Sequence, residues 1–223
     1  MSAYLVKLLA LYLKDLLAEL RTKEVVSASL VFSLMVLVLF NFAFDLQVDR
    51  AQAVAPGVLW VTFLFAGVLA LGRGFAREQD RGTLEGLLLS PADRGALYLA
   101  KLLANATFML IAEVVSLPAF VGLFNLGPDW PRLIAVVLLG TLGFAGLGTL
   151  LAAMAANTRA REVMLSLLLF PLALPVLIAT VKATGQALGE AAEEGHPWLS
   201  LLAAFDAIFL AVSFLLFDYV IES

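Results

Sequence analysis

The sequence predicts an all-α, polytopic membrane protein with six transmembrane helices, an N-terminal amphipathic helix and a short cytoplasmic coupling helix. Three observations support this fold class. Hydrophobic residues occupy 62% of the 223 positions and charged residues only 14%, whereas soluble domains carry about 25% charged residues. The mean hydropathy is +1.00. Six long apolar runs alternate with short polar segments, and most of the lysines and arginines lie in those segments.

Residues 1–24 predict the amphipathic helix, on the cytoplasmic side. Its leucines recur every three or four positions, as at Leu5, Leu9, Leu13 and Leu16, which places them along one side of a helix. Helices of this type lie in the membrane surface. A helix that packs on the protein's own cytoplasmic side would show the same pattern, and both interpretations stay open.

Six apolar runs follow, and each is expected to cross the membrane. A transmembrane helix needs about 20 apolar residues, and the second run is short unless it extends to Phe75. Between the first two runs, Asp45 to Pro56 is expected to be a turn region. The expected spans are 25–44, 57–72, 102–126, 133–156, 163–184 and 199–217.

Two spans carry residues that affect helix packing. Pro171 and Pro175 predict a kink in the fifth span. In the fourth span, glycines are expected to let neighbouring helices approach closely. They stand at positions 140, 143, 146 and 148.

The distribution of basic residues predicts the orientation. If the N-terminus is cytoplasmic, the cytoplasmic segments 1–24, 73–101 and 157–162 hold eleven of the fourteen Lys and Arg residues. Because basic residues are enriched in cytoplasmic loops, we expect a multi-pass protein of the inner (cytoplasmic) membrane with both termini in the cytoplasm. The opposite loops are short, so residues 1–223 are expected to form one permease domain, with the six-helix bundle at 25–217.

The longest polar stretch between two spans is the segment 73–101. Inside it, Gly82 is expected to end the helix that comes from the second span, and Thr83 to cap a short helix that reaches Leu89. Three leucines of this short helix share one face. A helix of that length is marginal in water. We therefore expect it to fold against a partner protein.

A second helix start is predicted directly after this short helix. Ser90 is expected to cap it and Pro91 to take its first position, with Asp93 in its first turn. A push on the short helix would then move both neighbouring spans, as coupling to a motor protein requires. The candidate ATPase-coupling residues are Arg77, Glu78, Asp80, Arg81, Gly82, Thr83, Leu84, Glu85, Leu87 and Leu88.

Glu113 lies about midway along the third span. A charge at that depth costs roughly 2.5–3.5 kcal/mol on insertion scales, so the side chain is expected to face the bundle interior. Glu113 is a candidate pathway or gating residue. A hydrogen bond to Asn105, Thr141 or Ser166 would give it a structural role instead.

Asp206 in the last span is the second intramembrane candidate. It would either line a vestibule that opens outward or pair with Lys182, and the pairing is the favoured interpretation. The acidic segment 190–194 lies in the preceding loop, and the sequence leaves its contacts open.

Composition excludes several kinds of chemistry. The chain has no cysteine and one histidine, which excludes disulfides and a multi-histidine metal site. His196 would suit an axial haem ligand, but a lone histidine is more typical of a solvated loop. The charged residues gather on one side of the membrane, away from any expected cavity. An enzyme acting alone is therefore not expected, nor is a nucleic-acid partner.

At the coupling residues the chain resembles the membrane subunit of an ABC-2-type exporter, whose first cytoplasmic loop docks on a separate ATPase. The pattern is Arg77-Glu78, Arg81-Gly82-Thr83-Leu84-Glu85, Leu88, Ser90-Pro91 and Lys101. Over nearly its whole length the chain resembles, more narrowly, the CcmB family, the haem exporter permease of cytochrome c maturation. This resemblance is carried by the stretches 14–15, 19–24, 56–61, 75–91, 181–184 and 205–209.

The resemblance implies a complex with the ATPase CcmA and the haem-handling membrane protein CcmC, in which ATP hydrolysis serves the delivery of haem to apocytochromes c. Haem would be a transported or handled ligand, no cofactor would be bound covalently, and ATP would act only through the partner subunit. Two other functions stay open: an ABC-2-type permease for a lipid, glycan or drug, and a scaffold without transport. The sequence also leaves open whether two copies form a homodimer and whether haem passes through this subunit.

Overall fold

The computed structural model describes residues 3–44, 48–80, 82–83, 86, 93–156, 158, 160–189 and 197–222. Every regular element in these ranges is a helix. The helices are α1 (Ala3–Thr22), α2 (Glu24–Phe44), α3 (Val48–Asp80), α5 (Arg94–Leu123), α6 (Trp130–Ala156), α7 (Arg161–Ala187) and α8 (Trp198–Glu222). Six of these, all but α1, contain stretches long and apolar enough to cross a membrane. The predicted all-α class with six spans is confirmed.

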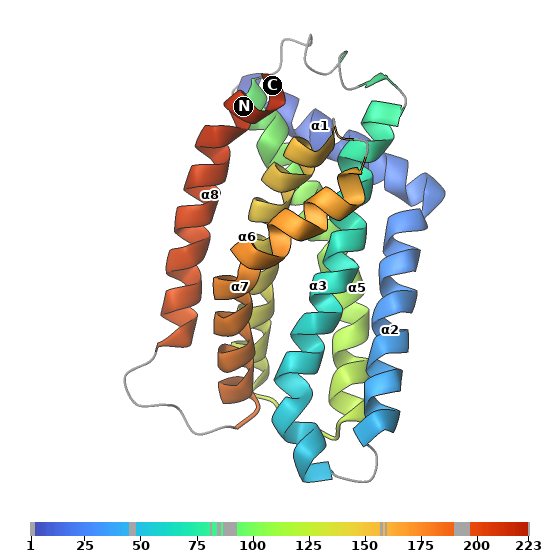
Figure 1. The fold of residues 1–223 in the computed structure, drawn as a ribbon, viewed down its shortest axis with the longest axis vertical. Coiled ribbons are helices and arrows are strands. Elements are labelled where there is room, and N and C mark those ends of the chain that lie inside the picture. Colours follow the sequence, from blue (N-terminus) through green and yellow to red (C-terminus); the bar gives the residue numbers. More distant parts are fainter. Residues whose placement is uncertain are drawn as a thin grey trace.

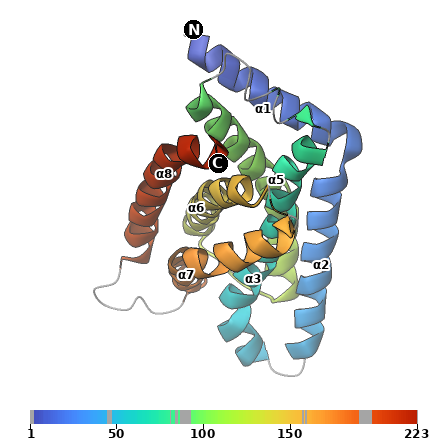
Figure 2. The ribbon, with the colours of Figure 1, turned by 45° about the horizontal axis from the view of Figure 1, so that its top comes forward.

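The six spanning helices run side by side, and α1 lies crosswise over one end of them (Figures 1 and 2). The start of α1 and the end of α8 lie at that same end, where α3 also ends and α5 begins (Figure 1). Helix α8 stands at the edge of the bundle and packs on α6, α7 and α5. The start of α1, the end of α3, the start of α5 and the end of α8 therefore share one side of the molecule (Figure 1).

An elbow at Lys23 joins α1 to α2. Lys23 has a φ of 56°, a left-handed conformation that breaks the helical path. The side chain of Glu19 is buried there, and its Oε1 accepts hydrogen bonds from the backbone N–H groups of Val25 at 2.7 Å and Val26 at 3.0 Å. The first turn of a helix has no internal acceptors for such groups. A residue of α1 thus caps the first membrane span.

Helix α1 packs on the protein itself, and its contact with a membrane surface stays a prediction. Leu11, Tyr12 and Leu16 pack against the core of the bundle, mainly on α5. Its other side carries a stripe of exposed leucines, Leu5, Leu9, Leu13, Leu17 and Leu20. One side is therefore a packing surface, while the leucine stripe is apolar and faces away from the protein.

Two helix boundaries differ from those that the sequence predicts. The expected turn from Asp45 to Pro56 is wrong for most of its length, because α3 begins at Val48 and runs through Pro56. Proline is tolerated in membrane helices where neighbouring groups satisfy the freed backbone. Asp93 does not lie in the first turn of the next helix but is the N-cap of α5, where its Oδ1 accepts a hydrogen bond from the Gly95 N–H at 2.9 Å.

The glycines of α6 bring α3 and α8 close to it, as predicted. A Cβ atom at Gly140 would lie 2.2 Å from the ring of Trp60 in α3, and one at Gly146 would lie 2.5 Å from Leu210 in α8. The indole of Trp60 is fixed further by a 2.8 Å hydrogen bond from its Nε1 to Thr184 of α7. Helix α7, which contains the two predicted kink prolines, changes direction along its length (Figure 1).

The core divides into two clusters along the bundle. The cluster against which α1 packs includes Phe75, Tyr98 and Phe217. The other includes Trp60, Phe120 and Leu133, among others. On α5, Met109 belongs to the first cluster and Leu117 to the second, so that the buried Glu113 lies between them.

Candidate functional site

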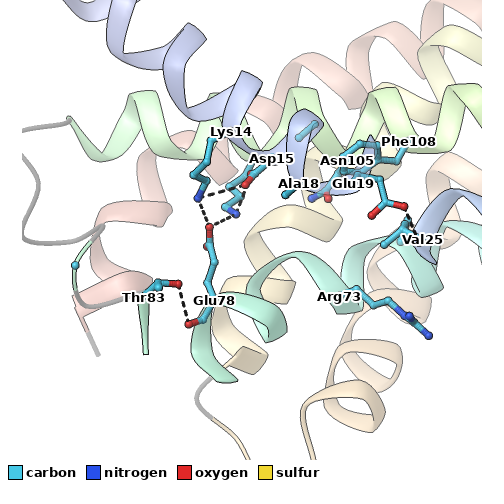
Figure 3. Close-up of a pocket in the computed structure, with 14 residues that line it drawn as sticks. Lys14, Asp15, Ala18, Glu19, Val25, Arg73, Glu78, Thr83, Asn105 and Phe108 are labelled. Atoms are coloured by element: carbon cyan, nitrogen blue, oxygen red, sulfur yellow. Dashed lines mark hydrogen bonds and ion pairs between the residues drawn. The ribbon is translucent and has the colours of Figure 1, made fainter. Parts of the chain in front are cut away.

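Four charged side chains from three helices meet at the end of the bundle that α1 covers. Lys14 and Asp15 come from α1, Glu78 from the last turn of α3, and Lys101 from α5 (Figure 3). Lys101 Nζ lies 2.7 Å from Glu78 Oε1 and 2.9 Å from Asp15 Oδ2. Lys14 Nζ lies 3.3 Å from Asp15 Oδ1 and also donates to Glu78 Oε1. Each ammonium group thus contacts both carboxylates, which closes a charge ring.

Burial within the charge ring is uneven. The side chain of Lys101 is 4% exposed and that of Glu78 is 9% exposed, whereas that of Lys14 is 43% exposed. A buried charge is tolerated when it is paired and hydrogen-bonded, and Lys101 has two carboxylates. Its Nζ also lies 5.3 Å from the centre of the Phe75 ring, within the range of a cation–π contact.

The charge ring raises the pKa of its exposed member, Lys14. Burial lowers the pKa of Lys14, but the hydrogen bond to Glu78 and the negative charges of Asp15 and Glu78 outweigh that effect. The net result is that the pKa of Lys14 lies above its usual value. Opposite charges within a few ångströms favour the charged form in this way.

A cavity of about 420 Å³ adjoins the charge ring. Besides the four ring residues, its lining includes Glu19, Arg73 and Asn105, with apolar walls from Val25 and Phe108 (Figure 3). The expectation that the charged residues lie away from any cavity is therefore wrong. The reason is that α1 folds back over the ends of α3 and α5, so charged segments far apart in the sequence enclose a space.

The structure describes some of the predicted coupling residues. Gly82, two residues after the end of α3 at Asp80, has a φ of 62°, as expected of a helix-ending glycine. Thr83 and Gly86 have helical backbone, and the Thr83 hydroxyl donates to the backbone oxygen of Glu78 at 3.3 Å. Of the others, Arg77 and Asp80 lie in α3, but their side chains are outside the described part. Also outside the described residues are Arg81, Leu84, Glu85, Leu87, Leu88, Ser90 and Pro91.

Glu113 is buried in the bundle interior, as predicted, and is 3% exposed. Its Oε2 accepts a 2.7 Å hydrogen bond from the hydroxyl of Thr141 on α6. Of the three partners considered, Thr141 is thus the one observed, whereas Asn105 donates instead to Thr149 at 2.9 Å. The hydrogen bond gives Glu113 a structural partner and leaves its pathway role a prediction.

Asp206 is buried between α8 and α6. Neither of its carboxylate oxygens has a hydrogen-bond partner in the part of the chain that the structure describes. The expected pairing with Lys182 is therefore wrong. The physical reason is that the Asp206 side chain faces the backbone of Gly143 on α6, where the missing Cβ leaves room for it.

Sequence reasoning missed Lys14, Asp15 and Lys101 as members of a site. Lys14 and Asp15 were read as part of a surface helix, and Lys101 as the end of a polar segment. One signal was present, because Lys101 stands directly before a predicted membrane span, and charged side chains that enter such spans tend to pair with one another. Among the described residues, no group of three His, Cys, Asp or Glu side chains is arranged to hold a metal ion.

Six helices long and apolar enough to cross a membrane, with a ring of paired charges at one end of the bundle, define a multi-pass integral membrane protein. The model of the CcmB protein family matches residues 6–222. The chain is 34% identical over 164 residues to Heme exporter protein B of Paracoccus denitrificans, covering 73% of this chain and 75% of that protein. It is 34% identical over 177 residues to Heme exporter protein B of Pseudomonas aeruginosa, covering 78% of this chain and 79% of that one. The chain belongs to the CcmB family.

Proposed function

We propose that this protein is the transmembrane permease subunit of a haem exporter in cytochrome c biogenesis, coupled to a separate ATPase subunit. The observation that carries this function is the family match across residues 6–222. Curated relatives that share about a third of their residues with this chain are named for haem export. The match favours haem over the lipid, glycan or drug considered from the sequence.

The subunit itself is proposed to be non-catalytic. Haem would be the cargo or a handled ligand, and ATP would act only through the partner. The candidate site supports this assignment, because the four charged side chains of the charge ring are engaged with one another. Charges paired in this way support a mechanical role for the site.

The docking segment for the ATPase is proposed to be residues 83–89, and α1 is proposed to add its stripe of exposed leucines to the docking surface. Support comes from position, because α3 ends and α5 begins beside α1 at one end of the bundle (Figure 1). We place that end, with both termini, in the cytoplasm, since the corresponding segments hold eleven of the fourteen basic residues. The membrane is then the inner, cytoplasmic one, and residues 1–223 form one permease domain.

Two further assignments follow from the family. A haem-handling membrane protein similar to CcmC is proposed as the second partner, and the ATPase is proposed to be similar to CcmA. Glu113 is proposed as a pathway or gating residue, because it is an ionisable side chain buried midway along a span, and such residues mark ion or substrate pathways in membrane proteins. Asp206 is proposed as a second one, because its carboxylate oxygens have no hydrogen-bond partner among the described residues.

Deletion of the gene and purification of the intact complex test this function together. We expect the deletion strain to lose its c-type cytochromes and to regain them when this chain is supplied. We expect the purified complex to contain an ATPase and to show haem absorbance. Normal c-type cytochromes in the deletion strain, with a defect in lipid, glycan or drug export, would favour the other permease class.

A further inference from the structure

We propose that the charge ring transmits movement of the docking segment to α1 and to the membrane span of α5, which makes Lys14, Asp15 and Lys101 positioning residues for transport. The inference rests on the proposed function, because it requires an ATPase that moves the docking segment. It goes beyond that function by naming the contacts through which the movement travels. The two claims are separable by experiment.

Glu78 links the docking segment to the charge ring. It stands in the last turn of α3, two residues before the helix ends at Asp80. Its backbone oxygen accepts the hydroxyl of Thr83, the first residue of the docking segment. Its side chain enters the charge ring. One residue therefore joins the docking segment, through its backbone, to two other helices, through its carboxylate.

Helix α1 is linked to α3 mainly through the charge ring. Among the residues that the structure describes, this helix packs mainly on α5, slightly on α2 and little on α3. The contact of Lys14 with Glu78 is therefore a principal link from α3 to α1. Lys101 makes the corresponding link from α3 to α5, and Asp15 joins α1 to α5. A displacement of Glu78 would pull on both helices at once.

The charge ring has room to rearrange. Both lysines contact Oε1 of Glu78, while the buried Oε2 has no hydrogen-bond partner among the described residues. Rotation of the carboxylate would pass a lysine from one oxygen to the other without separating the charges. The adjoining cavity of about 420 Å³ leaves space for the side chains to follow. The ring is thus able to move as a connected unit.

The alternation of charge provides a sharp test. The two cations each contact the two anions, so inverting any one or two adjacent members places like charges together. Inverting all four restores every attractive contact with the same net charge. The fourfold variant combines Lys14→Glu, Asp15→Lys, Glu78→Lys and Lys101→Glu. A residue that serves only as a surface charge would gain nothing from this exchange.

The experiment uses the full complex and compares the wild type with Lys14→Gln, Lys101→Gln and the fourfold inversion. Arg73→Gln is the matched control, because Arg73 lines the same cavity but lies outside the ring and is 48% exposed. Three quantities are measured: the ATPase that co-purifies, its ATP turnover, and the c-type cytochromes formed in cells. Lys14→Gln keeps the test decisive if Lys101→Gln does not fold, since Lys14 is half exposed.

We expect the single variants to keep the ATPase and its turnover while c-type cytochromes fall by about tenfold, within the roughly 5–150-fold range of typical coupling free energies. The inversion should restore them, and Arg73→Gln should match the wild type. Undiminished cytochromes in Lys14→Gln would overturn the proposal. So would a folded inversion variant without rescue, or loss of ATPase binding in the single variants, which would make the ring part of the docking surface. If the wild-type complex holds no ATPase, the proposed function itself fails.

Discussion

The carboxylate of Asp206 in α8 lies directly against the backbone of Gly143 in α6. A Cβ atom built on Gly143 would stand 2.0 Å from Oδ1 of Asp206, far closer than non-bonded atoms approach. Helices α6 and α8 thus approach closely at a point where the carboxylate has no hydrogen-bond partner among the described residues. Close packing, rather than an ion pair, therefore sets this contact.

The first prediction follows from that contact. Gly143→Ala should lower the free energy of unfolding by about 1–3 kcal/mol, the usual cost of overpacking. Asp206→Ala removes a buried carboxylate without a described partner, so it should cost little stability and should relieve most of the Gly143→Ala penalty in the double variant. Unfolding in mixed micelles, followed by circular dichroism, measures all three. Gly57→Ala is the control, because a Cβ there meets nothing within 4 Å. Additive effects of the two substitutions would contradict the prediction.

A second prediction separates the structural from the functional role of Glu113. Glu113→Gln keeps an oxygen to accept the Thr141 hydroxyl, so its stability should stay within about 1 kcal/mol of the wild type, while formation of c-type cytochromes should be lost. Thr141→Val removes the donor and should cost about 1–3 kcal/mol of stability, whereas Thr141→Ser should behave as the wild type. If Glu113→Gln forms normal levels of c-type cytochromes, the role of Glu113 is only structural.

A third prediction concerns the docking segment. Leu84→Glu and Leu88→Glu should each weaken ATPase binding by about 2 kcal/mol or more, as loss of an interface hot spot does, which is on the order of thirtyfold in affinity. The measurement is the amount of ATPase that co-purifies from membranes. Leu199→Glu introduces the same charge at the start of α8, at the opposite end of the bundle, and should have no effect. If both variants bind the ATPase as the wild type does, residues 83–89 are not the docking segment.

The raised pKa of Lys14 gives a fourth prediction, about pH. Because this pKa is higher in the folded protein than in the unfolded chain, the Lys14 charge stabilises the fold fully below the unfolded pKa of about 10.4. That contribution disappears as the pH rises through the folded pKa. The stability difference between the wild type and Lys14→Gln should therefore be constant up to about pH 10 and narrow above it. Lys14→Arg keeps its charge at high pH, so its difference from Lys14→Gln should persist.

The spans could be predicted because the hydrophobic effect acts on local sequence. Long apolar runs have no stable place outside a membrane or a core, and all six formed helices. The start of α3 escaped prediction because Pro56 normally marks a break, yet the helix runs through it. Local breaking signals are weaker in membranes, where the backbone has no water to bond with. Helix ends there depend on neighbours as well as on sequence.

The candidate site was only partly predictable. Glu113 stood out because a charge inside an apolar run needs an explanation, and Glu78 because it lies in the long polar segment between two spans. The charge ring could not be predicted, because Lys14 and Glu78 are 64 positions apart and meet only when α1 folds back across the bundle. The choice of Lys182 for Asp206 was wrong for a related reason. Opposite charge suggested a partner, but the packing of α8 on α6 turned the side chain toward Gly143.

The capping of α2 by Glu19 limits how α1 is able to travel. Any displacement that withdraws this carboxylate leaves the N–H groups of Val25 and Val26 without their acceptor, at about 1–3 kcal/mol for each if they stay buried. Swinging about Lys23 with the carboxylate in place avoids that loss. Helix α2 therefore acts as a fixed pivot for rotation of α1. The N-terminal half of α1, which lies farthest from Lys23, would move the most.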